Sequence, residues 1–186
     1  MNKLLSKASN IIILPGNGCT PIMKCNWYAW LKAQLEKEGL KVDMEKYSMP
    51  DPHEAKESIW LPHVREKLNL TSKSLLIGHS SGAVAIMRLA ETDPVLGIVI
   101  VSGCHTDLGM ESEAISGYYA RPWKWNHIKK NAEHIIQLHS KDDPFIPIDE
   151  ARHISSNLNS DYHEYDDQGH FMEDTCPILL DILKNE

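Results

Sequence analysis

The stretch that decides the fold runs from Lys73 to Ala90 and reads Lys-Ser-Leu-Leu-Ile-Gly-His-Ser-Ser-Gly-Ala-Val-Ala-Ile-Met-Arg-Leu-Ala. Its apolar run over 75–77 is typical of a strand buried on both faces. The residues from 84 to 90 have apolar side chains at helical spacing, which predicts a helix. Between the two, Gly78 to Gly82 fits G-x-S-x-G, the pattern of a nucleophile elbow.

The elbow pattern has a steric cause. To expose the hydroxyl of Ser80 at the carboxyl end of a strand, the chain must turn sharply into a helix, which strains the backbone. Glycine at 78 and 82 removes the side chains that would collide there. The helix then points its N-terminus at the site, and the amide of Ser81 is expected to donate to an oxyanion. The alternative is an ordinary glycine-rich turn between a strand and a helix, and the five letters alone do not decide between them.

Length and charge restrict the class of protein. With 186 residues, of which 42% are hydrophobic, the chain fits one domain over 1–186 with a real core. A net charge of -7 without a cluster of Lys and Arg argues against a nucleic-acid partner or an anionic membrane surface. Residues 1–10 lack the apolar core of a signal peptide, and no apolar run reaches 18 residues. We therefore expect a soluble cytoplasmic protein whose four cysteines are free thiols.

Outside the elbow, short apolar runs alternate with helical patterns along the whole chain. Further strands are expected over 11–14, 42–47, 95–101, 135–138 and 162–165, and helices over 27–39, 54–68, 148–158 and 177–183. The run over 11–14 is expected to be the central strand. Strand and helix in alternation predict an α/β fold with a six-stranded, mostly parallel sheet and helices on both faces.

One segment breaks this alternation. Residues 103–131 are about five times longer than the usual link between a strand and its helix, and they contain Tyr118, Tyr119, Trp123 and Trp125. We expect this segment to form a short, aromatic-rich cap insertion over the carboxyl end of the sheet. The alternative is that these aromatic side chains only complete a core, as aromatic residues commonly do.

A serine hydroxyl becomes a nucleophile only when a base takes its proton, so Ser80 requires a histidine oriented by a carboxylate. On this type of strand–turn–helix scaffold the order along the chain is serine, acid, histidine. The loop after the strand expected at 162–165 contains His170, and parallel sheets place their sites at the carboxyl ends of strands. His170 is therefore the predicted base. His79, beside the nucleophile, is interpreted as a packing and hydrogen-bonding residue of the elbow.

The loop after the strand expected at 135–138 offers two acids, Asp142 and Asp143. Asp143 is preferred because the two prolines that follow it restrict the loop that would aim its carboxylate, and Asp142 remains the alternative. A second oxyanion donor is expected from the loop after the first strand. The backbone amide of Asn17 is the first candidate there, with Gly18 as the second.

In several sequence motifs the chain resembles the retinoblastoma-binding protein 9 family of small serine hydrolases, which have the α/β-hydrolase fold. The resemblance covers essentially the full length. It is carried by the motifs Pro15-Gly16-Asn17-Gly18, Met49-Pro50-Asp51-Pro52, Glu57-Ser58-Ile59-Trp60-Leu61-Pro62, Gly78 to Gly82, Ser116-Gly117-Tyr118-Tyr119, Arg121-Pro122-Trp123, Asp142-Asp143-Pro144-Phe145 and Gly169-His170-Phe171.

The resemblance implies that Ser80, Asp143 and His170 occupy the family's catalytic positions. It also implies hydrolysis of small-molecule carboxylic esters or amides without a cofactor or metal. The family's name comes from binding a retinoblastoma-type pocket protein through Leu-x-Cys-x-Glu. The comparable stretch here, 68–72, reads Leu-Asn-Leu-Thr-Ser and has neither the cysteine nor the acid, so that partner is not expected.

An apolar or aromatic group on the substrate is expected from the aromatic side chains near the predicted site. The candidate substrate-binding residues are Trp60, Trp123 and Phe145.

Other classes of protein explain less of the sequence. A nucleotide-binding protein would use Gly16-Asn17-Gly18 after the first strand, but the third glycine of that fingerprint is replaced by Pro21. A non-enzymatic protein-binding module on a hydrolase scaffold is not excluded by the fold alone. A metal hydrolase is disfavoured because the histidines show no H-E-x-x-H or comparable cluster.

Overall fold

A computed structural model describes residues 3–185, and within them six strands form one sheet in the order β2-β1-β3-β4-β5-β6. Every neighbouring pair is parallel. The strands are β1 Asn10–Leu14, β2 Val42–Asp43, β3 Ser74–His79, β4 Val95–Val101, β5 Ala132–Ser140 and β6 Asp161–Tyr165. The predicted parallel six-stranded sheet is confirmed.

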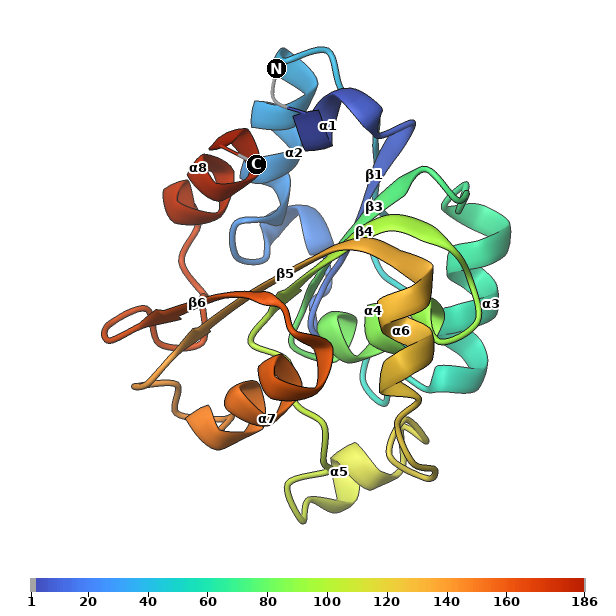
Figure 1. Ribbon diagram of the computed structural model, residues 1–186, viewed down its shortest axis with the longest axis vertical. Coiled ribbons are helices and arrows are strands. Elements are labelled where there is room, and N and C mark those ends of the chain that lie inside the picture. The colour runs from blue at the N-terminus through green and yellow to red at the C-terminus, as the bar shows by residue number, and fades with distance from the viewer. Residues whose placement is uncertain (1–2, 186) are drawn as a thin grey trace.

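Helices cover both faces of this sheet (Figure 1). They are α1 Lys3–Lys7, the 3₁₀ helix η1 Ile22–Lys24, α2 Tyr28–Lys37, α3 Glu57–Lys67, α4 Ser81–Ala90, α5 Glu111–Ala114, α6 Trp125–Asn131, α7 Ile148–Leu158 and α8 Pro177–Asn185. On one side lie α1, α2 and α8, and on the other α3 and α6 pack against α4, with α7 beside α6 and β5. No helix within residues 3–185 is both long and apolar enough to cross a membrane.

The core of the protein lies along β3, β4 and α4. Every residue of these two strands is buried, which matches their nearly continuous apolar sequences. Every residue of helix α4 is buried, which matches a sequence that is apolar apart from Ser81 and Arg88. This burial fixes the N-terminus of α4 at the carboxyl end of β3, where the elbow lies.

Two expectations about the first strands are wrong. Strand β1 is not central, because it lies between β2 and β3, one place from the edge of the sheet. Strand β2 is much shorter than the predicted 42–47. Beyond Asp43 the chain leaves the sheet, and the carbonyl oxygens of Lys46 and Tyr47 accept hydrogen bonds from Met23 and Ile22 of η1, at 3.3 and 2.8 Å.

Residues 103–131 divide into two parts. The second part contains α6, which packs against α4, β5 and α7 and is the ordinary helix that connects two parallel strands. Only the first part, with the short helix α5, extends away from the sheet (Figure 1).

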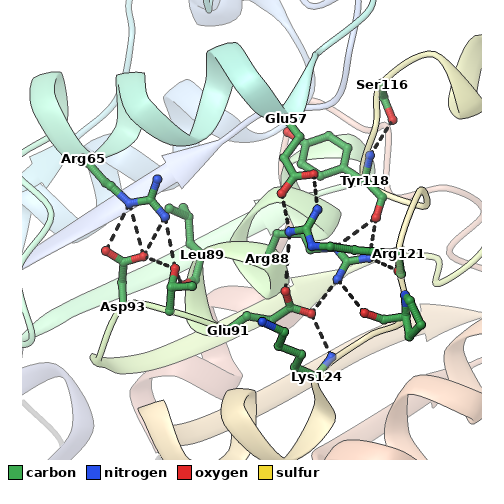
Figure 2. Close-up of polar contacts among 12 residues, drawn as sticks. Glu57, Arg65, Arg88, Leu89, Glu91, Asp93, Ser116, Tyr118, Arg121 and Lys124 are labelled. Carbon is green, nitrogen blue, oxygen red and sulfur yellow. Dashed lines mark hydrogen bonds and ion pairs between the residues drawn. The ribbon is translucent and has the colours of Figure 1, made fainter.

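Buried charges hold residues 118–124 against α4 (Figure 2). Arg88 lies in the last turn of α4 and Glu91 directly follows that helix, with side chains 0% and 2% exposed, and the guanidinium donates to the carboxylate at 2.5 Å. Arg88 also donates to the carbonyl oxygens of Tyr118 and Arg121. Glu91 accepts from the amide of Lys124 at 2.9 Å. One side chain thereby fixes three backbone carbonyls, those of Tyr118, Arg121 and Pro122, in a stretch with no helix or strand of its own.

Candidate active site

Ser80 is the residue at which β3 turns into α4. Its backbone has φ 54° and ψ -120°, a region that residues other than glycine rarely adopt. The amide of Ser80 donates to the carbonyl oxygen of Val101 at 2.9 Å, which ties the turn to β4. Such strain persists only where the surrounding structure imposes it, and it concentrates at functional sites.

The two glycines of the elbow are required by close backbone contacts. A Cβ atom on Gly78 would lie 2.3 Å from the carbonyl oxygen of Gly82. A Cβ atom on Gly82 would lie 2.4 Å from the carbonyl oxygen of Leu14 on β1. Both distances are shorter than real Cβ contacts, and the atoms met are backbone, so neither contact is relieved by a side-chain rotation. The elbow packs directly on the neighbouring strand and allows a side chain at neither position.

Two loops at the carboxyl edge of the sheet bring Asp143 and His170 together. Asp143 follows β5 and His170 follows β6, and Asp143 Oδ2 lies 2.7 Å from His170 Nδ1. The other carboxylate oxygen accepts the amides of Phe145 and Ile146 at 2.9 and 3.0 Å. The side chain of Asp143 is completely buried, and that of His170 is 8% exposed.

The environment of Asp143 keeps it ionised. Burial by itself raises the pKa of this carboxyl group, but the hydrogen bond and charge of His170 and the two backbone amides outweigh burial, and the pKa is lowered from its usual value. An ionised carboxylate only accepts hydrogen bonds, so His170 Nδ1 carries a proton and donates it. The lone pair of the neutral imidazole is then on Nε2.

Asp142 makes different hydrogen bonds from those of Asp143. Its Oδ1 accepts from the hydroxyl of Ser140 at 2.5 Å and from the amide of Gly169 at 2.8 Å. Asp142 therefore joins the loop after β5 to the loop after β6, without a hydrogen bond to the imidazole. Of the two acids considered from the sequence, Asp143 is the one that contacts His170.

His79 holds the backbone of the loop that contains His170. The Tyr28 hydroxyl accepts from the amide of Gly16 at 3.0 Å and from Asn26 Nδ2 at 3.1 Å, so its own proton goes to His79 Nδ1 at 2.6 Å. His79 Nε2 then donates to the carbonyl oxygen of His170 at 2.7 Å. Burial, with the nearby His170, lowers the pKa of His79 to about 3, which keeps the ring neutral. Tyr28 is a hydrogen-bond partner of the elbow that the sequence did not indicate.

A cavity of about 500 Å³ lies over the elbow. Ser80 and His170 both line it, as do three other residues expected at the site, Ser81, Asn17 and Phe145. The Phe145 ring packs edge-on against the His170 imidazole, with ring centroids 5.1 Å apart. Further lining residues that the sequence analysis did not name are Cys19, Asn26, Cys104, Leu108, Met110, Ser112, Glu113, Ile146 and Met172.

Trp60 and Trp123 do not line this cavity, so these two indoles are packing residues where substrate contacts were expected. Trp60 is fully buried, and its Nε1 donates to the carbonyl oxygen of Pro50 at 2.7 Å. Trp123 stacks on Trp125, with the Arg88 guanidinium 3.6 Å from its ring centroid. None of the four aromatic residues expected in the cap, Tyr118, Tyr119, Trp123 and Trp125, lines the cavity over the elbow, so the part of the chain from 3 to 185 shows no aromatic cap there.

The loop after β1 leaves one amide available beside the elbow. The amide of Gly16 donates to the Tyr28 hydroxyl, and the amide of Gly18 donates to the carbonyl oxygen of Pro52 at 2.6 Å. Between them, the amide of Asn17 has no hydrogen-bond partner among the described residues. The amide of Ser81 is the first of α4 and has no acceptor within its own helix. Within 3–185, no three His, Cys, Asp or Glu side chains group in a way that would hold a metal ion.

Comparisons with known proteins identify the family of the chain. A sequence model of the family described as serine hydrolase matches residues 11–176. The chain is 40% identical over 181 residues to serine hydrolase RBBP9 of Rattus norvegicus, covering 97% of each chain. The structure of the ydeN gene product from Bacillus subtilis has a TM-score of 0.84 at 24% identity, covering 96% of this chain and 98% of the other.

A more distant fold relative is Est1E from Butyrivibrio proteoclasticus, whose complex with ferulic acid gives a TM-score of 0.72 at 12% identity, covering 96% of this chain and 88% of the other. The fold is that of the α/β hydrolases. This chain is an enzyme and belongs to the serine hydrolase family.

Proposed function

We propose that the protein hydrolyses small-molecule carboxylic esters or amides through an acyl-enzyme formed on Ser80, with His170 as the base and Asp143 as the acid that orients it. The observation that carries the proposal is the 2.7 Å contact between Asp143 and His170 beside a cavity that also contains the strained Ser80. A nucleophile, a base and an orienting carboxylate are the three parts that acyl transfer by serine requires.

In the proposed reaction, Ser80 Oγ attacks the carbonyl carbon while its proton passes to His170 Nε2. The imidazolium is stabilised by the Asp143 carboxylate and later protonates the leaving alcohol or amine. Water then attacks the acyl-enzyme, with the same imidazole as base, and releases the carboxylic acid. The Asp143 contact to Nδ1 and the His79 contact to the His170 backbone support this role, because together they would hold the lone pair of Nε2 in one orientation before substrate arrives.

The developing oxyanion would be held by the amides of Ser81 and Asn17. The hydrogen bonds that occupy Gly16 and Gly18 support Asn17 over its neighbours as the second donor. One such donor contributes on the order of 3 kcal/mol to transition-state stabilisation. The substrate would lie against Phe145, a residue that is 59% exposed and whose ring packs against His170.

We also propose that the chain forms a single catalytic domain over 1–186. Residues 103–131 then contribute part of the cavity wall rather than a separate unit. Cys104, Leu108, Met110 and Glu113 support this assignment because they line the cavity from that segment.

The test is the hydrolysis of a panel of p-nitrophenyl esters and aminoacyl amides by the wild type and by Ser80→Ala. The wild type is expected to turn over at least the activated esters, and Ser80→Ala should lose at least about 10³-fold in kcat. Ser72→Ala is a matched control because Ser72 is exposed at the opposite end of β3. Full activity in Ser80→Ala would refute the assignment, and hydrolysis by neither protein would refute the reaction class.

A further inference from the structure

Glu113 is the one acidic residue among the described residues that line the cavity over the elbow. It lies on α5, the short helix that extends from the sheet, and it is half-buried. The lining of the same cavity also contains apolar side chains, among them Leu108, Met110 and Met172. Binding cavities commonly combine an apolar lining with a few placed polar groups that fix the orientation of the ligand.

A chain of hydrogen bonds fixes Glu113 as an acceptor. The Cys104 thiol lies 3.0 Å from the Tyr119 hydroxyl, and that hydroxyl donates to Glu113 Oε2 at 3.4 Å. A carboxylate only accepts, so the phenol proton points to Glu113, and the phenol oxygen accepts from the thiol. Burial raises the pKa of Cys104 to about 12, which keeps the thiol protonated and able to donate.

The carboxylate of Glu113 has little compensation for its burial. Among the described residues it makes no salt bridge, and its one hydrogen-bond donor is the neutral Tyr119 at a long distance. Burial, together with the nearby negative charge of Asp107, raises the pKa of Glu113. A partly desolvated carboxylate is stabilised most by a cationic donor, which supplies both opposite charge and hydrogen bonds.

From this arrangement we propose that Glu113 binds a protonated amine on the substrate, so that the enzyme prefers esters or amides that carry an ammonium group. The inference rests on the proposed function, because it assigns the class of substrate for the same cavity. An ammonium group has three donors and no acceptor, which matches the free acceptor sites of a carboxylate whose one partner is a phenol. Glu113 is then a specificity-determining residue and takes no part in proton transfer at Ser80.

The experiment measures a selectivity ratio, which is kcat/KM for an amine-bearing ester divided by kcat/KM for the same ester without the amine. Two arms place the amine on different parts of the substrate. One compares p-nitrophenyl esters of glycine, β-alanine and 4-aminobutyric acid with the corresponding acetate, propanoate and butyrate. The other compares 2-aminoethyl benzoate with ethyl benzoate. Intrinsic reactivity of each ester cancels when the ratio for a variant is divided by that for the wild type.

The critical variant is Glu113→Gln, which removes the charge and keeps the shape. Its selectivity ratio should fall about tenfold in at least one arm, corresponding to about 1.4 kcal/mol. Glu111→Gln is the matched control, because it removes the same charge from an exposed position on the same helix and should keep the wild-type ratio. Labelling of each protein by a fluorophosphonate probe verifies that its active site is folded.

The outcomes separate this inference from the function on which it rests. If the wild type hydrolyses the esters but shows no preference for the amine in either arm, the inference is wrong and the proposed function stands. Retention of the preference in Glu113→Gln, or its equal loss in Glu111→Gln, also overturns the inference. If the wild type hydrolyses no ester and takes no label, the proposed function fails, and the inference fails with it.

Discussion

Replacing Asp143 by asparagine tests the orientation of the proposed base. The amide oxygen of the new side chain can still accept from the amides of Phe145 and Ile146, so the loop is expected to keep its shape. Its amide nitrogen then faces His170 Nδ1, 2.7 Å away in the wild type, and that nitrogen only donates. The imidazole must therefore accept on Nδ1 and carry its proton on Nε2, where it is unable to take a proton from Ser80.

The wrong tautomer lowers kcat by roughly 10⁴-fold in serine triads. This corresponds to about 5 kcal/mol in the activation barrier. The assay is initial-rate hydrolysis of a p-nitrophenyl ester at saturating substrate, with thermal unfolding of each variant to verify the fold. Asp142→Asn is the control, because its side-chain oxygen can still accept from Ser140 and Gly169, and its kcat should stay within about tenfold of wild type. The reasoning is refuted if Asp143→Asn keeps wild-type kcat, or if Asp142→Asn is the more damaging change.

The remaining predictions concern stability. Arg88→Met should lower the free energy of unfolding by about 3–5 kcal/mol in urea titrations, because it removes the closest ion pair of the buried Glu91 and leaves it the more distant Arg121, at 3.5 Å. Arg65→Met breaks a partly exposed pair and should lower the same free energy by less than about 1 kcal/mol (Figure 2). Equal effects would contradict the account of the buried network. For His79, burial lowers the folded-state pKa to about 3, so below its ordinary pKa the unfolded chain takes up a proton that the folded chain does not. The wild type should therefore lose on the order of 2 kcal/mol more than His79→Gln between pH 7 and pH 5, and parallel stability curves would contradict this.

Those parts of the fold that depend on local sequence could be predicted. Strand β4 and helix α7 have the bounds expected from their sequences. Burial of β4 on both faces requires a continuous apolar run, and the buried face of α7 requires apolar residues at helical spacing, so consecutive residues are enough to predict both. The elbow glycines are likewise a local steric requirement, seen in the Cβ contacts at Gly78 and Gly82. The length of β2 was wrong because the chain beyond Asp43 pairs with η1, a tertiary contact without a local pattern.

The surroundings of the site depend on contacts between residues far apart in the chain. Tyr28 meets His79 across 51 residues, and His79 meets His170 across 91, so no spacing in the sequence indicates this link. The roles of Trp60 and Trp123 were mistaken because an aromatic side chain has the same signature whether it packs in a core or lines a cavity. No sequence pattern indicated Glu113 for a similar reason, since an acidic side chain on a short polar helix usually lies in solvent.

The most direct test of the account is to identify the residue that forms a covalent adduct with a fluorophosphonate probe. The wild type is treated with the probe, digested, and its labelled peptide sequenced by mass spectrometry, with Ser80→Ala treated in parallel. The account predicts a single phosphonylated side chain, Ser80, and no labelling of the variant. An adduct on another residue of an active enzyme, or equal labelling of Ser80→Ala, would contradict it.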